Sequence, residues 1–192
     1  MPRRPSVPSR ALPVLRLLAV PPALGLALAL VVSVPAGEAA AGEDCDAGPL
    51  FVIERSSNAN IVVFEANREE TGALHPGKPL TVYWRMFAER GQREELNALE
   101  KRLAYGYDVV GEPGPQEALV ALHALRTRPV DVRLASGCPA AHIASDGRDM
   151  RLRRVFVQLK SRFLIPSVAY VELHGEDAET GSAIEERFEP KK

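Results

Sequence analysis

The chain has 192 residues, with 24 basic and 25 acidic side chains and a formal net charge of −1. Apart from its first forty residues, a chain of this length is enough for one domain. Its near balance of charge gives no electrostatic attraction to nucleic acid, which argues against a DNA- or RNA-binding protein.

Residues 1–41 are predicted to be a signal peptide. They carry four arginines and no acidic residue before Glu38, and an apolar run extends from Leu17 to Val34. Two prolines divide this run and leave residues 23–34, which have the length of a secretory hydrophobic region. Small residues follow, and Ala41 fits the last position before cleavage. An uncleaved leader is the alternative, because the whole run of eighteen residues could span a bilayer and anchor the protein.

The mature chain would begin at residue 42 and contain 151 residues, enough for one domain with its own core. Without the leader, 20 basic and 24 acidic residues remain, which gives a net charge of about −4. The expected location is the periplasm or the exterior of the cell. Residues 42–50 are expected to form a lead-in, and residues 51–190 a single β-rich domain.

Both cysteines, Cys45 and Cys138, lie in the part predicted to be exported. An even number of cysteines in an oxidising compartment predicts a disulfide, with two free thiols as the alternative. The acidic residues Glu43 and Asp44 argue against lipid attachment at Cys45. Two isolated cysteines and no clustered histidines fall short of the four ligands of a zinc site, so no metal and no cofactor is expected.

Three strands are predicted in the first part of the domain. Residues 51–56 and 61–67 are rich in β-branched and aromatic side chains, and the polar residues between them favour a turn. Residues 80–87, with the sequence LTVYWRMF, have the alternation of a third strand.

An amphipathic helix is predicted between Gly91 and Gly106. Leu96, Leu99 and Leu103 fall at positions i, i+3 and i+7 and would form one apolar stripe against the sheet. Gly91 would be the N-cap, with acidic residues in the first turn, where the helix dipole favours them. Gly106 would adopt the left-handed conformation that ends many helices.

The second half of the domain is predicted to be all β. Residues 116–129 fit either a helix or a strand, and a strand is favoured because the alternating residues 130–135 can complete a hairpin with it. Asp146-Gly147 predicts another hairpin turn. Further strands are expected at 152–160, 167–175 and 182–190, the last as a charged edge strand.

About nine short strands and one helix predict a mainly β fold. The expected architecture is a β-sandwich or an open β-barrel of antiparallel strands, with the amphipathic helix packed on the sheet.

Several stretches of the chain resemble a family of uncharacterised bacterial exported proteins, the domain of unknown function 4833. They are FVIERSSNANIVVFEAN, VYWRMF, REELNALEKRLAYGYDV and VAYVELHG, and the similarity extends from Phe51 to Phe188. The resemblance implies an exported, mostly β domain. It implies no activity, cofactor or catalytic residue, and the cysteine pair is not part of the family pattern.

Tyr170, Glu172 and His174 form the best polar group in the sequence, because the period of a strand places all three on one face. A carboxylate beside an imidazole can do acid–base work. The same three residues would also suit the solvated face of an antiparallel sheet.

Four aromatic residues, Trp84, Tyr105, Tyr107 and Tyr170, are candidates for ligand binding. The alternative is that their rings pack in the core, with each polar atom hydrogen-bonded to backbone. For the segment Tyr105-Gly106-Tyr107, a corner between helix and sheet is the favoured interpretation.

The expected function is a non-catalytic binding or structural module of the cell envelope, whose partner is an unknown envelope ligand or protein. One alternative is a hydrolase acting on an envelope polymer or a small ester, with Glu172 and His174 as its catalytic candidates. Another is a membrane-anchored envelope protein, if the leader stays attached.

Overall fold

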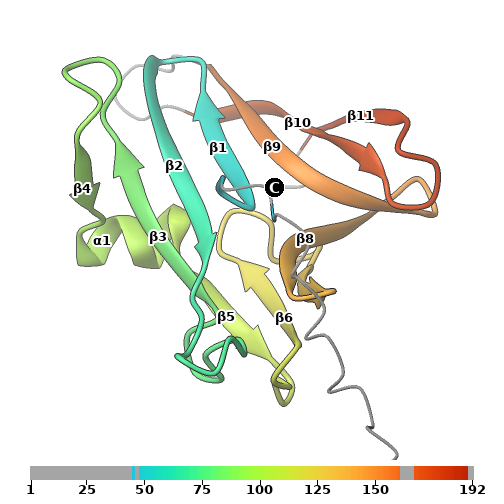
Figure 1. Ribbon diagram of the computed structural model, residues 1–192. Coiled ribbons are helices and arrows are strands. Elements are labelled where there is room, and N and C mark those ends of the chain that lie inside the picture. Colours follow the sequence, from blue (N-terminus) through green and yellow to red (C-terminus); the bar gives the residue numbers. More distant parts are fainter. Residues whose placement is uncertain (1–44, 46–47, 161–166, 190–192) are drawn as a thin grey trace, which may run out of the picture. The chain divides into compact units, whose positions relative to one another are not determined.

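The computed structural model describes residue 45 and residues 48–160 and 167–189, and this part of the chain is mainly β (Figure 1). The predicted signal peptide and its cleavage site lie outside the described residues. No helix in the described ranges is long and apolar enough to cross a membrane.

Eleven strands form one sheet. A single helical segment lies between β4 and β5, with one turn of α-helix, α1 (Ala98–Glu100), continued by a π-helical turn, η1 (Lys101–Tyr105). The strands are β1 (Phe51–Arg55), β2 (Asn58–Ala66), β3 (Leu80–Arg85), β4 (Arg93–Glu95), β5 (Tyr107–Val110), β6 (Glu117–Leu122), β7 (Val130–Ala135), β8 (Cys138–Ser145), β9 (Arg148–Lys160), β10 (Ser167–Asp177) and β11 (Ala183–Phe188).

The long strand β9 organises the sheet. One edge of β9 pairs with β10, which in turn pairs with the edge strand β11. The other edge is shared, because residues 148–151 pair with β8 and residues 154–157 pair with β1. Two wings therefore extend from β9, one with the order β1-β2-β3-β4 and the other with the order β8-β7-β6-β5 (Figure 1).

The hydrophobic core is built from both wings. In the first wing Phe51 stacks on Phe64 with 4.4 Å between ring centroids. Val120 and Val130 of the second wing are fully buried in the same cluster. The alternation of apolar side chains along each strand turns one face of the curled sheet inward, as the sequence pattern predicts.

The prediction of a mainly β fold is confirmed, but the antiparallel prediction is wrong for one strand pair. β1 runs parallel to β9, with Val52 opposite Arg154. A parallel pair needs a long connection, and about a hundred residues separate these two strands in the chain. All eleven strands belong to one curled sheet, so two separate sheets of a sandwich are not observed in the described residues.

The favoured interpretation of residues 116–129 is confirmed, because β6 and β7 form an antiparallel hairpin. The predicted turn between β8 and β9 is also present. Asp146 and Gly147 have φ values of 48° and 77°, the left-handed conformation that a two-residue hairpin turn requires. β11 is an edge strand, as expected.

The prediction of a long amphipathic helix between Gly91 and Gly106 is wrong. Gly91 has φ of 71° and lies in a turn before β4, and the helix begins later, with Asn97 as its N-cap. Asn97 and Glu100 form a capping box through two hydrogen bonds of 2.9 Å. Leu96 is buried, whereas the side chains of Leu99 and Leu103 are 57% and 64% exposed. The leucine stripe therefore does not pack against the sheet.

The predicted disulfide between Cys45 and Cys138 is present, with 5.2 Å between the two Cα atoms. It joins the segment that precedes β1 to the first residue of β8. The bond therefore connects the segment before the first wing to the second wing, directly after the turn between β7 and β8.

Candidate functional site

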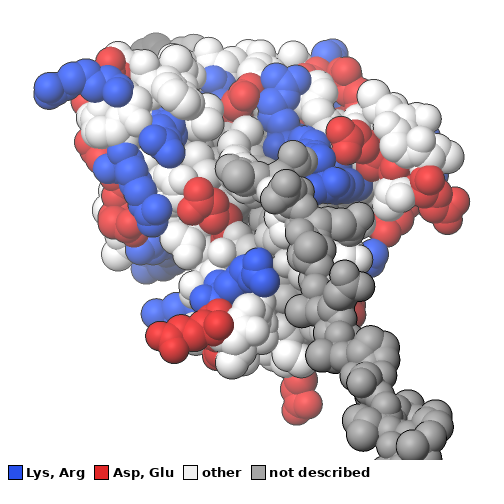
Figure 2. All heavy atoms as spheres, viewed as in Figure 1, with Lys and Arg blue, Asp and Glu red and all other residues white. Residues whose placement is uncertain are grey.

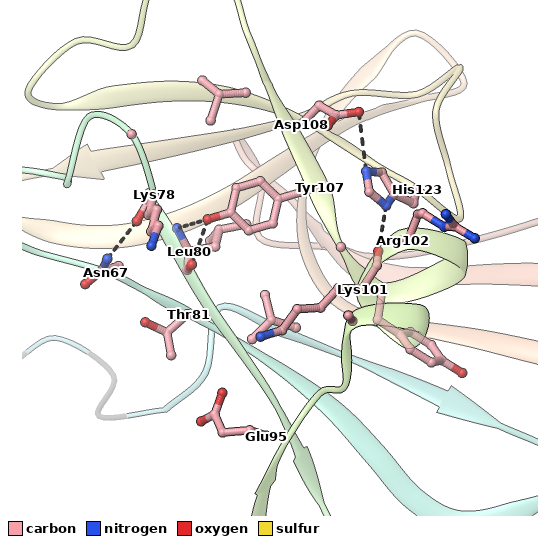
Figure 3. Close-up of a pocket in the computed structure, with 16 residues that line it drawn as sticks. Asn67, Lys78, Leu80, Thr81, Glu95, Lys101, Arg102, Tyr107, Asp108 and His123 are labelled. Carbon is pink, nitrogen blue, oxygen red and sulfur yellow. Dashed lines mark hydrogen bonds and ion pairs between the residues drawn. The ribbon is translucent and has the colours of Figure 1, made fainter.

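A groove of about 940 Å³ lies between the start of β3, the helical segment and β5. Its walls come from the 67–82 region, from the helix and from residues 105–109, with His123 completing the lining. Figure 3 shows these elements around an open space. Its volume is within the range of small-molecule sites, roughly 300–1,000 Å³.

The groove carries cationic side chains that lack counter-ions. Lys78, Lys101 and Arg102 line it and are exposed, and within the described residues no ion pair involves any of them. In Figure 3 the side chains of Lys78 and Lys101 reach the groove from opposite sides, whereas Arg102 lies at the rim beside His123.

Each of the two acidic side chains of the groove contacts another side chain of this protein. Glu95 lies 3.5 Å from Arg93. Asp108 lies 3.3 Å from Nε2 of His123. The groove presents positive charge to a ligand, because its three cationic side chains outnumber its two acidic ones and form no ion pair within the described residues.

Tyr107 spans the floor of the groove. Its hydroxyl donates a hydrogen bond to the carbonyl of Leu80 at 2.7 Å and accepts one from the Leu80 N–H at 3.2 Å. Burial raises the pKa of the Tyr107 hydroxyl above its ordinary value, with the Leu80 hydrogen bond opposing this shift. The ring is thus held in place across the gap between β5 and β3, and its face is available to the groove (Figure 3).

Tyr105 and Trp84 pack against each other and against an arginine of the same protein. Their rings meet edge to face with centroids 5.1 Å apart. The guanidinium of Arg55 lies 4.6 Å from the Trp84 ring centroid and 5.8 Å from that of Tyr105. The cation–π position of this aromatic pair is therefore already filled. Tyr105 also lines the large groove, whereas Trp84 lines a separate cavity of about 260 Å³.

Gly106 connects the helix to β5 in an extended conformation, with φ of −77° and ψ of 177°. The left-handed conformation predicted for it is wrong. A Cβ atom at this position would lie well under 3.0 Å from the carbonyl oxygen of Lys101 and 3.0 Å from Cε1 of His123. Glycine is required because the chain passes directly over the end of the helix.

His123 fastens the same junction. Its Nδ1 donates a hydrogen bond of 2.7 Å to the carbonyl of Lys101, and its backbone N–H donates one of 2.9 Å to the carbonyl of Gly106. The corner interpretation of Tyr105-Gly106-Tyr107 fits this geometry, and the corner also forms one wall of the groove.

The predicted polar group of β10 lies elsewhere. Glu172 and His174 are adjacent on one face, with Oε2 of Glu172 3.4 Å from Nε2 of His174. Arg187 binds Glu172 and lies over the ring of Tyr170, with 4.2 Å to its centroid. The hydrogen bond from Arg187 holds the pKa of Glu172 below its ordinary value, although desolvation opposes the shift.

Arg154 is a second arginine beside this group. Arg154 donates a hydrogen bond of 3.1 Å to Nε2 of His174 and lies 3.2 Å from Glu54. Basic and acidic side chains adjoin one another over β9, β10 and β11 on the face in view (Figure 2). Neither Glu172 nor His174 lines the groove or the smaller cavity beside Trp84. The structure therefore brings the pair together away from both of these cavities.

The same cluster is the one group of possible metal ligands in the described residues. Glu172, His174 and Glu185 could each offer one atom, and these atoms lie within 4.8 Å of one another. Two guanidinium groups already bind Glu172 and His174, and their positive charge opposes the entry of a further cation.

The sequence-based candidates thus fall into two separate groups. Tyr105 and Tyr107 meet at the groove, with Trp84 behind Tyr105, whereas Tyr170, Glu172 and His174 lie on the outer face of β10. Sequence reasoning missed Lys78 and Lys101, because lysines in a turn and on a short helix are ordinary solvent-facing residues. Their significance depends on the curl of the sheet, which brings residues 67–123 around one space.

Together these features define a β-rich domain with a curled sheet and an open, positively charged groove beside a short helix. The chain belongs to the family described as "Domain of unknown function (DUF4833)", whose family model matches residues 51–187. The resemblance seen in the sequence is therefore confirmed. No curated protein and no solved structure gives a match.

Proposed function

We propose that this protein is an exported, non-catalytic binding module of the cell envelope, and that its groove holds a ligand with an anionic group. The observation that carries the proposal is the pair Lys78 and Lys101, which reach the groove from opposite sides and lack counter-ions within the described residues. Cations without partners beside a concave surface attract anions and raise their local concentration.

The disulfide and the leader support export. A disulfide between Cys45 and Cys138 suits an oxidising compartment, and residues 1–41 have the pattern of a signal peptide. N-terminal sequencing of the protein recovered from the cell envelope or the medium tests this. A mature terminus at Gly42 supports cleavage after Ala41, and an intact leader in the membrane fraction supports the anchored alternative.

The binding proposal is tested with anionic probes. We expect citrate, inorganic phosphate or poly-glutamate to shift the amide NMR signals of residues 78–82 and 101–109 in a saturable way. The variant Lys78→Glu/Lys101→Glu should weaken binding at least tenfold because it reverses the charge of the groove. The matched variant Arg90→Glu/Arg126→Glu makes the same change of charge at exposed residues outside the groove and should bind as the wild type does. Binding that survives the lysine reversal, or no saturable binding to any probe, contradicts the proposal.

The hydrolase alternative has less support from the geometry. A catalytic pair needs a substrate position within hydrogen-bond reach, and Glu172 and His174 are engaged by Arg187 and Arg154 on an open sheet face. An ester-cleaving activity that disappears in both Glu172→Gln and His174→Gln would favour the hydrolase over the binding module.

A further inference from the structure

The groove lies between two strand edges. β5 is the terminal strand of its wing and pairs only with β6 among the described strands. Across the groove, β3 pairs with β4 only at residues 83–85, so residues 80–82 extend beyond that partner. Residues of both exposed edges, 80–82 and 107–109, line the groove.

The backbone groups of β5 are oriented toward this gap. The backbone N–H of His123 donates a hydrogen bond to the carbonyl of Gly106, so this carbonyl points toward the β6 side. Backbone groups alternate in direction along an antiparallel strand. The N–H and C=O groups of Tyr107 and Val109 therefore point away from β6, toward the open edge.

The same alternation holds on the other side of the groove. The backbone N–H of Asn67 donates a hydrogen bond of 2.8 Å to the carbonyl of Pro79, so this carbonyl points toward β2. The backbone groups of Leu80 consequently face the groove, where both of them bind the Tyr107 hydroxyl. A side chain of this protein thus makes, at one point, the hydrogen bonds that a neighbouring strand would make.

The lining limits the sequence that could occupy the gap. Val82 and Val109 are partly exposed and supply apolar surface, and Lys78 and Lys101 supply positive charge near the two walls. An extended chain presents successive side chains to opposite sides. A segment with alternating apolar and acidic residues would match both features.

We infer that the groove binds an extended acidic segment of a partner protein, which adds to the edge of β5 as a further strand. Strand addition of this kind uses backbone hydrogen bonds for affinity and alternate side chains for specificity. An exposed strand edge is a template for such pairing. This inference rests on the proposed binding function and specifies the ligand of that groove.

The test uses the peptide acetyl-Glu-Val-Glu-Val-Glu-amide and the mature protein, starting at the terminus found by sequencing. Binding is followed by isothermal titration calorimetry, and strand addition by hydrogen exchange of the Tyr107 and Val109 amides. We expect exchange at these two amides to slow at least tenfold in the complex, because their N–H groups become hydrogen-bonded. Exchange at Ala121 of β6, away from the open edge, should not change.

Two further peptides separate strand addition from attraction between charges. One is N-methylated at both valines and the other at all three glutamates, which removes alternate backbone donors without changing the charge. At least one of them should bind tenfold more weakly than the parent peptide. Equal binding of all three peptides, with no protection at Val109, would overturn strand addition while leaving the anionic groove intact.

Failure of the proposed function gives a different result. In that case neither the peptide nor citrate, phosphate or poly-glutamate binds, or the peptide binds equally to the wild type and to Lys78→Glu/Lys101→Glu. Binding of those anions without binding of the parent peptide contradicts strand addition alone. Sedimentation velocity identifies one more outcome. If the protein alone forms dimers and its Val109 amide is already protected, a second copy occupies the edge and the inference is wrong.

Discussion

At the scale of single residues, Gly106 shows how a correct position can be predicted for the wrong reason. Glycine after a leucine-rich segment suggests a left-handed helix end. The observed backbone is extended, and the requirement for glycine comes from the carbonyl of Lys101 directly beneath it. The sequence shows that this position is glycine, but the backbone contact that excludes a larger residue can be seen only in the folded chain.

We expect Gly106→Ala to lower the free energy of unfolding by about 1–3 kcal/mol, as overpacking of a tight site does. The added methyl group would collide with backbone, so the helix and β5 must move apart. Urea unfolding followed by fluorescence of the single tryptophan, Trp84, measures the change. Gly114→Ala is the control, because its Cβ would meet its nearest neighbour, Glu117, at 3.7 Å. Equal stability of Gly106→Ala and wild type would contradict the close approach.

At the scale of elements, the leucines of the helical region show where periodicity is insufficient. The spacing of Leu96, Leu99 and Leu103 fits one face of a long helix. Because the chain forms β4 first and begins its helix only after Asn97, the three leucines do not share a face against the core. Leu96 alone enters it.

We expect Leu96→Ala to cost about 2–4 kcal/mol of stability, the usual effect of removing a buried leucine side chain. Leu103→Ala should change stability by no more than about 0.5 kcal/mol, since its side chain is 64% exposed. Thermal unfolding of the two variants beside the wild type makes the comparison. Similar losses of stability in both variants would instead support the prediction of a long amphipathic helix packed on the sheet.

The edge strand β11 is attached to the sheet by a polar cluster as well as by its backbone. Glu186 forms a two-pronged ion pair with Arg128, with distances of 2.7 and 2.8 Å, and accepts a hydrogen bond of 2.6 Å from the buried Ser145. The hydrogen bond from Arg128 is the main reason that the pKa of Glu186 lies below its ordinary value of 4.5. Desolvation raises this pKa, and the hydrogen bond from Ser145 lowers it further.

This pKa shift predicts a pH-dependent loss of stability. A carboxyl group with a lowered pKa stabilises the fold above its unfolded pKa of 4.5, and that contribution disappears as the pH falls through the folded value. We expect Glu186→Gln to cost about 1–2 kcal/mol at pH 7. The difference from wild type should shrink steadily as the pH falls below 4.5.

Urea unfolding at pH 7 and at pH 3 provides the measurement. Glu185→Gln is the matched control, because this neighbouring side chain is exposed and lies 3.7 Å from His174, away from Arg128 and Ser145. A difference between Glu186→Gln and wild type that is the same at both pH values would show that the charge of Glu186 is not responsible.

Most strands were predictable from local pattern, because burial of one sheet face imposes a period of two on a strand. β4 was predicted as helix, since its three residues are all exposed and show no such period. The turn at Asp146-Gly147 was also predictable, because a two-residue hairpin turn needs two successive left-handed residues and this dipeptide adopts them easily. The parallel pairing of β1 with β9 was not readable, because it joins segments about a hundred residues apart. The groove depends on that pairing and on the curl of the sheet, so Lys78 and Lys101 could not be connected in advance.

At the scale of the whole molecule, the two wings meet along β9 and are joined again by the disulfide. The cysteines close a loop of 93 residues, which includes the first wing, the groove and most of the second wing. In the chain-entropy model, closing a loop of this size restricts the unfolded chain and stabilises the fold by about 4–5 kcal/mol.

We therefore expect reduction with dithiothreitol, or the variant Cys45→Ser/Cys138→Ser, to lower the free energy of unfolding by about 4–5 kcal/mol. Because the cross-link acts mainly on the unfolded chain, peptide binding at the groove should persist in the reduced protein wherever it remains folded. Urea unfolding with and without reductant measures the loss, and the double variant, which should not respond to reductant, is the control. If the oxidised and reduced wild-type proteins unfold at the same urea concentration, the wings are held together by β9 and the shared core alone.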